Sequence, residues 1–271
     1  MLFSLLKDFH KMANSQPIGI FDSGIGGTTI FREIHQLLPL EKTIYLADSK
    51  NAPYGRKSKE EIIQLSYKNT EQLLKMNCKI IVVACNTATT NAIKELRKKY
   101  KIPFIGIEPA IKPAALQSSK KKIGVLATKG TLSSELFSNT SSKLTTDIDL
   151  IEVVGKGLVE KIEAGKANDE STFLLLKEIL SPLLAQDIDY LVLGCTHYPY
   201  LIPQLKRILP ADVKIIDSGK AVALQTKTVL KNNNNLATTP QGNPVFYSNK
   251  NPRILKRFIR GKDFKISYLD F

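Results

Sequence analysis

The chain has 271 residues, 43% hydrophobic and 24% charged, a composition that excludes an intrinsically disordered protein. Its formal net charge of +14 suggests a nucleic-acid partner, but the basic residues are spread along the chain, which favours an ordinary solvated basic surface. No stretch is long and apolar enough for a membrane span, and three cysteines without an export signal argue against a disulfide framework and for the cytoplasm.

The first residues of the chain carry no regular pattern. Their short apolar opening is interrupted by charged residues and is too short for a secretory core, and regular patterning begins at Pro17. We therefore expect residues 1–16 to form an extension outside the fold.

From Pro17 onward, short apolar runs alternate with helical patterns. This alternation is typical of a mostly parallel α/β architecture, and a continuous apolar run such as Ile80–Val83 predicts a strand buried on both faces. Ser58 and Glu61 form a capping box that predicts the start of a helix. The predicted strands are Pro17–Phe21, Thr43–Leu46, Lys79–Ala84, Phe104–Ile107, Ile123–Ala127, Leu150–Val154, Tyr190–Gly194 and Val213–Ile216.

Two strand-to-helix segments resemble each other. One predicted strand is followed by Cys85-Asn-Thr and a later one by Cys195-Thr-His, about one small domain apart, and Asp22-Ser-Gly is echoed by Asp217-Ser-Gly. We therefore predict two similar α/β domains with mostly parallel sheets and the active site in the cleft between them. The first domain is predicted over residues 17–109 and 218–271, and the second over residues 110–217.

Four polar motifs directly follow predicted strands. In a parallel sheet, ligands bind outside the carboxyl ends of the strands, so we expect these motifs to line one cleft. The motifs are Asp22-Ser-Gly-Ile-Gly-Gly27, Asp48 with Pro53-Tyr-Gly55, Cys85-Asn-Thr87 and Cys195-Thr-His-Tyr-Pro199.

Cys85 and Cys195 are the candidate catalytic groups. Both fall at a predicted helix N-terminus, where the helix dipole and free N–H groups lower the pKa of a thiol and favour the thiolate. A single cysteine is most often a small buried apolar group, and this is our prediction for Cys78, which begins a strand. Two thiols on opposite faces of an amino acid can remove an α-proton from one face and return one to the other.

Asp22 and His197 could hold and relay protons for these thiols. Each has a simpler alternative, since Asp22 is also a good helix N-cap and His197 a turn residue or, with Cys195, a zinc ligand. Neither a CxxC pair nor an HExxH motif supports zinc. The glycines between residues 24 and 27 match no nucleotide-binding pattern, and we interpret them as letting the backbone approach a small ligand.

The order and spacing of the four motifs resemble those of glutamate racemases, in the aspartate/glutamate racemase superfamily, over nearly the whole chain from about residue 17. The resemblance implies a cytoplasmic isomerase that interconverts L- and D-glutamate by two-base, thiolate/thiol proton transfer at the α-carbon, with no cofactor and no metal. It implies that the D-glutamate product supplies peptidoglycan synthesis, and so cell wall biogenesis and cell shape. It is compatible with a homodimer and implies no membrane and no specific nucleic-acid partner.

The resemblance also implies roles for individual positions. Cys85 and Cys195 match the two catalytic proton donors and acceptors, and Asp22 and His197 match the residues that assist them. The residues that match the substrate-binding positions of the family are Asp22, Ser23, Tyr54, Gly55, Asn86, Thr87, Thr196 and His197.

A further acidic position follows from the resemblance. The family often carries a glutamate after a short segment near residue 155, and we align Glu163 with it as an assisting catalytic residue. Glu160 is the competing position. The structural alternative for Glu163 is an exposed helix carboxylate.

Three other functions compete with this prediction. An aspartate racemase would use the same two-thiol chemistry, although the Gly-Cys-Thr-His-Tyr-Pro motif favours glutamate by resemblance. A DNA-associated binding protein would use the positive charge, and its affinity would fall steeply with salt. A cysteine hydrolase would use one thiol as a nucleophile and would leave the second cysteine turn unexplained.

Overall fold

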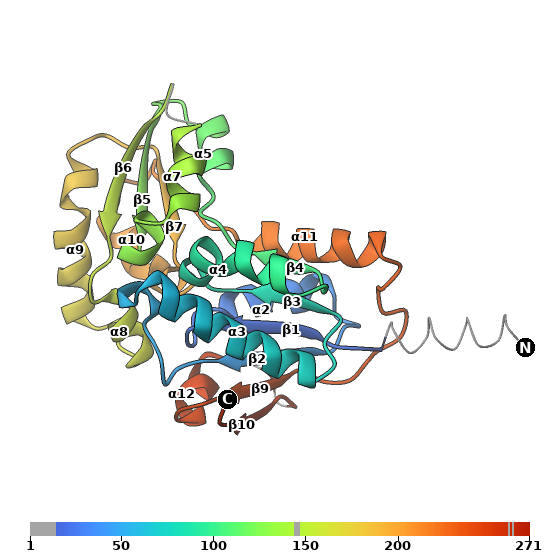
Figure 1. Cartoon of the computed structure of the whole chain (residues 1–271). Coiled ribbons are helices and arrows are strands. Elements are labelled where there is room, and N and C mark those ends of the chain that lie inside the picture. The colour runs from blue at the N-terminus through green and yellow to red at the C-terminus, as the bar shows by residue number, and fades with distance from the viewer. Residues whose placement is uncertain (1–14, 144–146, 260, 262) are drawn as a thin grey trace, which may run out of the picture.

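The computed structural model describes residues 15–143, 147–259, 261 and 263–271, so residues 1–14 of the predicted extension lie outside the described residues. The described strands form a six-stranded and a four-stranded sheet, and all their pairings are parallel. The predicted α/β class is therefore confirmed, and Figure 1 shows the two sheets with their covering helices. Within these described ranges no helix has the length and apolar character needed to cross a membrane.

The six-stranded sheet is covered by helices on both faces. Ile18 and Ile20 of β1 (Ile18–Asp22) pack toward α2 (Thr28–Leu37) and α11 (Gly219–Asn232). Phe21 packs toward α3 (Lys59–Lys75) and α4 (Asn86–Lys99), because successive side chains of a strand point to opposite faces. In strand order the sheet is β10 (Lys265–Tyr268), β9 (Val245–Ser248), β2 (Thr43–Ala47), β1 (Ile18–Asp22), β3 (Ile80–Val83) and β4 (Phe104–Gly106). Its helices are α2 (Thr28–Leu37), α3 (Lys59–Lys75), α4 (Asn86–Lys99), α11 (Gly219–Asn232) and α12 (Pro252–Phe258).

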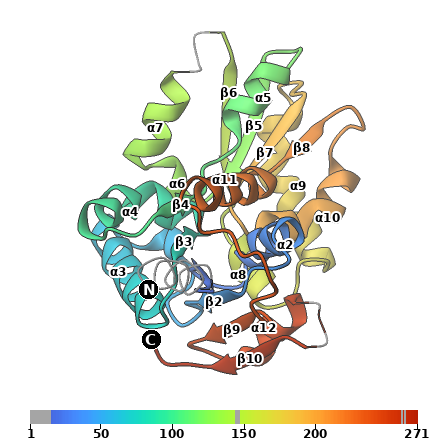
Figure 2. The same ribbon diagram turned by 90° about the vertical axis from the view of Figure 1, so that its right-hand side faces the viewer.

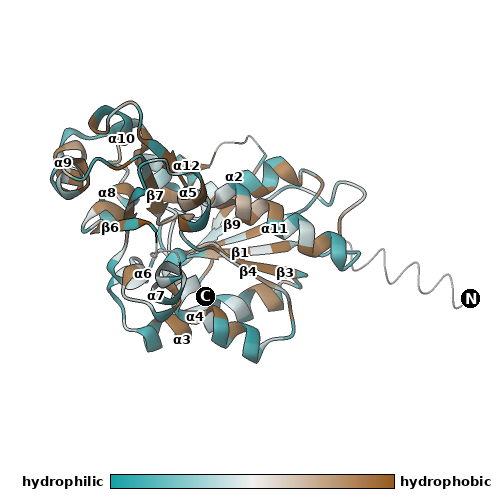
Figure 3. Ribbon diagram, turned by 90° about the horizontal axis from the view of Figure 1, so that it is seen from above, coloured by the Kyte–Doolittle hydropathy of each residue, from teal (hydrophilic) through white to brown (hydrophobic). Residues whose placement is uncertain are grey.

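The four-stranded sheet is likewise buried between helices. One face packs against α5 and α7, and the other against α8, α9 and α10. In strand order the sheet is β6 (Asp149–Val154), β5 (Lys122–Ala127), β7 (Tyr190–Gly194) and β8 (Lys214–Ile216). Its helices are α5 (Ile111–Gln117), α6 (Lys129–Leu132), α7 (Glu135–Ser142), α8 (Leu158–Glu163), α9 (Glu170–Leu184) and α10 (Ile202–Ile208). Figure 3 shows that strands such as β3 are largely hydrophobic, whereas helices such as α3 and α4 carry both hydrophilic and hydrophobic residues.

All eight predicted strands are present, with ends that differ by a residue or two, and the capping box of Ser58 and Glu61 is formed. The prediction missed β9 and β10, which extend the first sheet beyond β2 (Figure 2). Both are short strands of four residues, β10 at the edge of the sheet and β9 next to it. Their residues are partly exposed, so their sequences lack a continuous apolar run. The domain boundaries at 109/110 and 217/218 stay a prediction.

The chain passes between the sheets twice, after β4 and after β8. The two connecting segments are joined where the Ser218 hydroxyl donates a hydrogen bond of 2.5 Å to the carbonyl oxygen of Glu108. This contact holds the crossings side by side. It leaves the carboxyl ends of β1, β3, β5 and β7 directed toward one shared region.

Candidate active site

The strand ends meet at a small inner pocket. Both Cys85 and Cys195 line it, so residues 110 positions apart in the sequence share one enclosed volume. Of the predicted substrate-binding residues, all except Asp22 line this pocket. The lining residues are Ser23, Pro53, Tyr54, Gly55, Cys85, Asn86, Thr87, Thr128, Val159, Cys195, Thr196 and His197.

Cys85 is the N-cap residue of α4, as its predicted position at a helix N-terminus requires. The Ala88 N–H donates to its sulfur over 3.4 Å, and its S–H donates to the Ser23 hydroxyl over 3.7 Å. The Ala88 N–H lowers the pKa of this thiol, as the helix N-terminus predicts, but this effect does not decide the direction of the shift. Burial raises the pKa of Cys85 well above its ordinary value, the nearby Asp22 carboxylate adds to the rise, and the two hydrogen bonds only partly offset it. Cys85 is therefore a neutral thiol at physiological pH.

Cys195 differs from the prediction, because no α-helix begins at it. The residues after it enter a short 3₁₀ turn, η2 (Tyr198–Leu201), which precedes α10 and offers no α-helical dipole to the sulfur. Instead, the Nδ1 atom of His197 lies 3.8 Å from the Cys195 sulfur. The local electrostatic influence on this thiol therefore comes from an imidazole, not from a helix terminus.

His197 is held between Cys195 and Glu163. Its Nε2 atom lies 2.7 Å from Glu163 Oε1, and the ring is buried. Burial alone would lower the pKa of His197, but the contacts with Cys195 and Glu163 outweigh it and raise the pKa well above its ordinary value. Cys195 therefore lies beside a basic imidazole and Cys85 near the Asp22 carboxylate, so the two sulfurs have neighbours of opposite charge.

Asp22 ends β1 and is fully buried. Its carboxylate accepts hydrogen bonds from the Gly24 N–H (2.9 Å) and from the Thr196 hydroxyl (3.1 Å), and so links the two sheets. Burial raises its pKa to about 6, although the neighbouring His197 acts in the opposite direction. The N-cap alternative is wrong, because α2 begins after Gly27.

The structure distinguishes the two candidate glutamates. Glu163 Oε1 accepts from the Ile25 N–H over 2.8 Å as well as contacting His197, so it is not an exposed helix carboxylate. Glu160 instead forms an ion pair with Arg56 outside the inner pocket. Of the two, only Glu163 is placed to orient the imidazole.

The glycine-rich loop makes room for protein side chains, and its approach to a ligand stays a prediction. A Cβ atom on Gly24 would overlap the Glu163 carboxylate, and one on Gly26 would overlap the His197 ring. A Cβ on Gly27 would lie only 2.7 Å from that of Asp22. The loop therefore allows these polar side chains to converge.

Replacing Gly26 by alanine is expected to lower kcat/KM for racemisation by about a hundredfold, because the added Cβ must displace the His197 ring. Steady-state kinetics with a purified, folded variant would measure the loss. Gly219→Ala at the start of α11 is the control, since its new Cβ would meet only side-chain atoms of Asp217, Glu33 and Ile30 outside the pocket. Wild-type activity in Gly26→Ala would contradict the assigned packing.

The Asn86 side chain has unsatisfied polar atoms at the inner pocket. Both its amide nitrogen and its amide oxygen are buried without a hydrogen-bond partner, although the residue lines the inner pocket. An unsatisfied buried polar group costs about 1–3 kcal/mol. A ligand with both a carboxylate and an ammonium group would satisfy the two atoms together.

Sequence reasoning missed the threonines that follow β5. Thr128 lines the inner pocket, and its hydroxyl lies 2.8 Å from that of Thr87 and 3.0 Å from that of Thr131. The same rule that selected the other motifs, a polar residue after a parallel strand, would have found Thr128. Asp48, which the rule did select, instead holds the Tyr54 hydroxyl behind the pocket.

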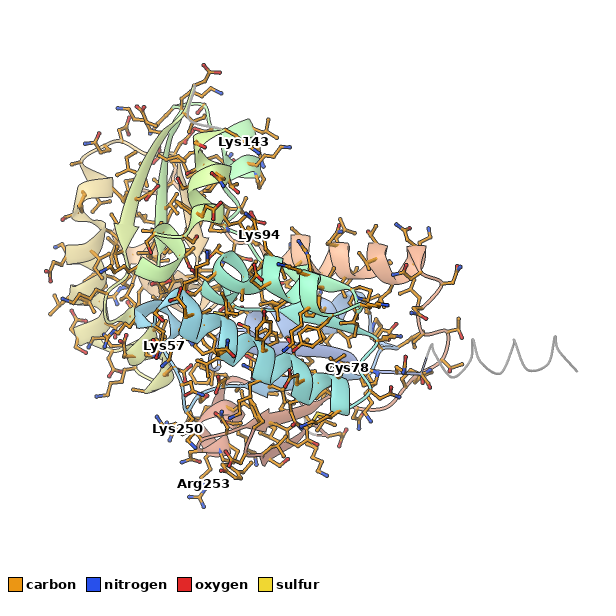
Figure 4. All side chains as sticks on the ribbon, viewed as in Figure 1. Lys57, Cys78, Lys94, Lys143, Lys250 and Arg253 are labelled. Atoms are coloured by element: carbon orange, nitrogen blue, oxygen red, sulfur yellow. The ribbon has the colours of Figure 1, made fainter. Side chains whose placement is uncertain are left out.

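Cys78 behaves as the predicted structural cysteine. It is buried against Gly19 and Leu73, and burial raises its pKa to about 12. Figure 4 places it at the far end of α3 from Lys57, which precedes that helix on the side of the pocket. Within the described part of the chain, no three histidine, cysteine or acidic side chains are grouped as a metal site would require.

Comparisons with known proteins agree on one family. The Asp/Glu/Hydantoin racemase family model matches residues 18–226. A glutamate racemase of Pseudomonas paraeruginosa is 42% identical over 248 residues, which cover 91% of this chain and 94% of that protein. One of Ectopseudomonas mendocina is 47% identical over 225 residues, 83% of this chain and 86% of its own.

Solved structures give the same result. Glutamate racemase isoform RacE1 from Bacillus anthracis has a TM-score of 0.84 and 33% identity, and the match covers 94% of this chain and 96% of that one. The Escherichia coli glutamate racemase in complex with L-glutamate and the activator UDP-MurNAc-ala has a TM-score of 0.82 and 31% identity, over 94% and 98% of the two chains.

Proposed function

Because the chain belongs to the Asp/Glu/Hydantoin racemase family and, within it, to the glutamate racemases, which are isomerases, we propose that it interconverts L- and D-glutamate without a cofactor or metal. The proposed chemistry is proton transfer between the α-carbon and the thiols of Cys85 and Cys195. One observation carries this proposal, namely that both sulfurs line the same small buried pocket from different sheets.

The contrast between the two cysteines suggests how a turnover starts. Cys195, beside the His197 imidazolium, is the base that removes the α-proton, and Cys85, a neutral thiol, is the acid that returns one to the opposite face. For the other enantiomer the roles are exchanged, so Cys85 must begin as the thiolate and Cys195 as the thiol. Asp22 and His197 assist Cys85 and Cys195, respectively, and Glu163 positions His197.

The substrate-binding residues stabilise the carbanion that develops at the α-carbon. We propose that Asn86, Thr87 and Thr196 donate hydrogen bonds to the substrate carboxylates, with the Ser23 hydroxyl and the segment at Tyr54 and Gly55 completing the set. Fixed donors in a site that excludes water stabilise developing charge more strongly than water does. None of these steps requires a redox change, and the substrate proton is exchanged through the thiols.

Turnover in D₂O, with a chelator and without pyridoxal phosphate, tests this proposal. A two-thiol enzyme keeps the substrate α-proton on one sulfur and delivers a solvent deuteron from the other. We therefore expect the product enantiomer to carry α-deuterium early in the reaction, while recovered substrate still carries hydrogen. Product that retains the substrate hydrogen would indicate a single base, and no racemisation of glutamate, assayed beside aspartate, would refute the proposal.

The acid limb of the pH profile reports on Asp22. Its pKa is raised to about 6, so the carboxylate is ionised above that pH and protonated below it, where it can no longer accept a proton. We expect kcat/KM to fall as the pH drops through about 6. Asp22→Asn is expected to lower kcat/KM by about a hundredfold and to flatten this limb. An unchanged limb in Asp22→Asn would assign it to another group.

The two enantiomers of glutamate have equal free energies in water, so their kcat/KM values must remain equal in every variant. A substitution on one side of the pocket can therefore lower the shared value of kcat/KM, but it can make the two directions differ only in how kcat/KM divides into kcat and KM. Unequal kcat values with equal kcat/KM are the expected signature of Asp22→Asn.

We further propose that the product serves peptidoglycan synthesis, and thereby cell wall biogenesis and cell shape, in the cytoplasm where three thiols remain reduced. The similarity of this chain to glutamate racemases supports this role. A strain without this chain is expected to require D-glutamate for growth. Growth without D-glutamate, in a strain that holds no second racemase, would refute the role.

A further inference from the structure

An outer pocket adjoins the inner one. It has a volume of about 380 Å³, and it shares Pro53, Gly55, Thr128 and Val159 with the inner pocket. Its other walls come from η1 (Tyr54–Arg56), the start of α6, and the turn between β6 and α8. The four shared residues therefore form a wall that the two pockets have in common.

The inner pocket by itself is too small for its proposed substrate. Its free volume is about 10 Å³, barely the space of one water molecule, whereas sites for small ligands measure roughly 300–1,000 Å³. The shared wall must move for an amino acid to reach the thiols. The outer pocket already has the necessary volume on the other side of that wall.

Positive charge is concentrated in the outer pocket. None of the described residues that line the inner pocket is lysine or arginine, whereas Arg56, Lys129 and Lys156 line the outer one. Arg56 is neutralised by Glu160, which lines the same pocket. Within the described residues, Lys129 and Lys156 form no ion pair with a carboxylate, so their charges are available to a ligand.

The two lysines come from different elements that meet at this pocket. Lys129 is the first residue of α6, and Lys156 lies in the turn that leads from β6 into α8. Gly157 beside it has a φ of 82°, a conformation that suits glycine and completes the turn. Both lysines are exposed and line the outer pocket from two different elements.

We propose that the outer pocket is the entrance to the active site, and that Lys129 and Lys156 bind a carboxylate of the incoming acidic amino acid. The inference rests on the proposed function only for the identity of that ligand. An acidic amino acid with two carboxylates and one ammonium group is a net anion, and a cleft lined by cations raises the local concentration of anions. In the inner pocket, neutral hydrogen-bond donors then bind the amino acid. No lysine or arginine therefore has to be buried there without a partner when the site is empty.

Alkylation of the two active-site thiols tests the entrance without relying on turnover. Iodoacetate carries a carboxylate and iodoacetamide does not, so the ratio of their rate constants at each cysteine reports the effect of charge on access. Reactivity of the sulfur itself affects both reagents and is largely removed by taking the ratio. Mass spectrometry of peptides would assign each rate constant to Cys85, Cys195 or Cys78.

The variant Lys129→Gln/Lys156→Gln is expected to lower the iodoacetate-to-iodoacetamide ratio at Cys85 and Cys195 by about threefold to tenfold at low salt. Salt is expected to lower this ratio in the wild type and to change it little in the variant. The matched control is Lys98→Gln/Lys231→Gln, which removes the same charge from exposed positions on α4 and α11 and should leave the ratio unchanged.

An unchanged ratio in Lys129→Gln/Lys156→Gln, or an equal fall in the control, would overturn the proposal. Failure of both reagents to alkylate Cys195, the sulfur beside His197, would also overturn it, since the pocket would then not lead to the site. Racemisation is measured separately in the wild type. A protein that does not turn over glutamate would refute the proposed function while leaving the alkylation result intact.

Discussion

Replacing either Cys85 or Cys195 by serine is expected to lower kcat for glutamate racemisation by about a thousandfold or more. A serine hydroxyl is far less acidic than a thiol, so it neither removes the α-proton nor returns one at a useful rate. Because each turnover uses both sulfurs, one on each face, the loss should be similar in the two variants. Chiral separation of the products, with the protein concentration raised to detect slow turnover, would measure it.

The pattern of residual exchange distinguishes two bases from one nucleophile. With a single thiol left, the enzyme can remove and replace the α-proton only on one face, so any α-deuterium exchange should be confined to one enantiomer. The other variant should exchange the opposite enantiomer. If one variant kept full racemase activity, the two-thiol mechanism would be wrong.

Cys78→Ser is the matched control for both substitutions. Cys78 is also buried and also has a raised pKa, but it lies at the end of the sheet away from the inner pocket (Figure 4). The folded variant should therefore keep wild-type kcat. A large loss of kcat in Cys78→Ser would mean that replacing a buried thiol, whatever its position, disturbs the site.

A buried ion pair outside the active site contributes to the stability of the fold. Lys79 and Glu41 form a buried ion pair of 2.7 Å at the start of β3 and before β2, with 1% of each side chain exposed. The ammonium also donates to the Asn235 carbonyl (2.7 Å), and the other Glu41 oxygen accepts from the Ala237 N–H (2.8 Å). The pair thus attaches the segment after α11 to the N-terminal ends of β2 and β3.

Glu41→Gln is expected to lower the free energy of unfolding by about 3–5 kcal/mol, because it leaves the Lys79 ammonium buried without its carboxylate. Burial already lowers the pKa of Lys79, and Glu41 acts against that shift. Urea denaturation at neutral pH would measure the loss. The folded fraction should retain its kcat, since the pair lies outside the inner pocket.

Two further variants separate the charge effect from packing. The double variant Glu41→Gln/Lys79→Met removes both charges and should be more stable than Glu41→Gln alone. Asp270→Asn breaks an exposed ion pair with Lys50 (3.9 Å) and should cost less than about 1 kcal/mol. If Glu41→Gln and Asp270→Asn lowered the free energy of unfolding equally, then breaking the buried pair would cost no more than breaking an exposed one.

The sequence by itself determined the sheet strands, the capping box and the segments that carry the site. Apolar runs between helical patterns predict buried parallel strands because each strand must bury both faces, and this local rule identified β1 to β8. Polar residues after those strands identified the inner pocket, because parallel strands end on the same edge of their sheet. Neither inference needs a distant contact.

Only the tertiary structure decided how the site is held. Glu163, not Glu160, contacts His197 because the loop at Gly24 and Gly26 leaves space for it there. Burial, which no local pattern reports, raises the pKa of Cys85 against the effect of its helix terminus. These properties depend on burial and on contacts between side chains that are far apart in the sequence. The spacing of residues along the chain does not show which of them come into contact.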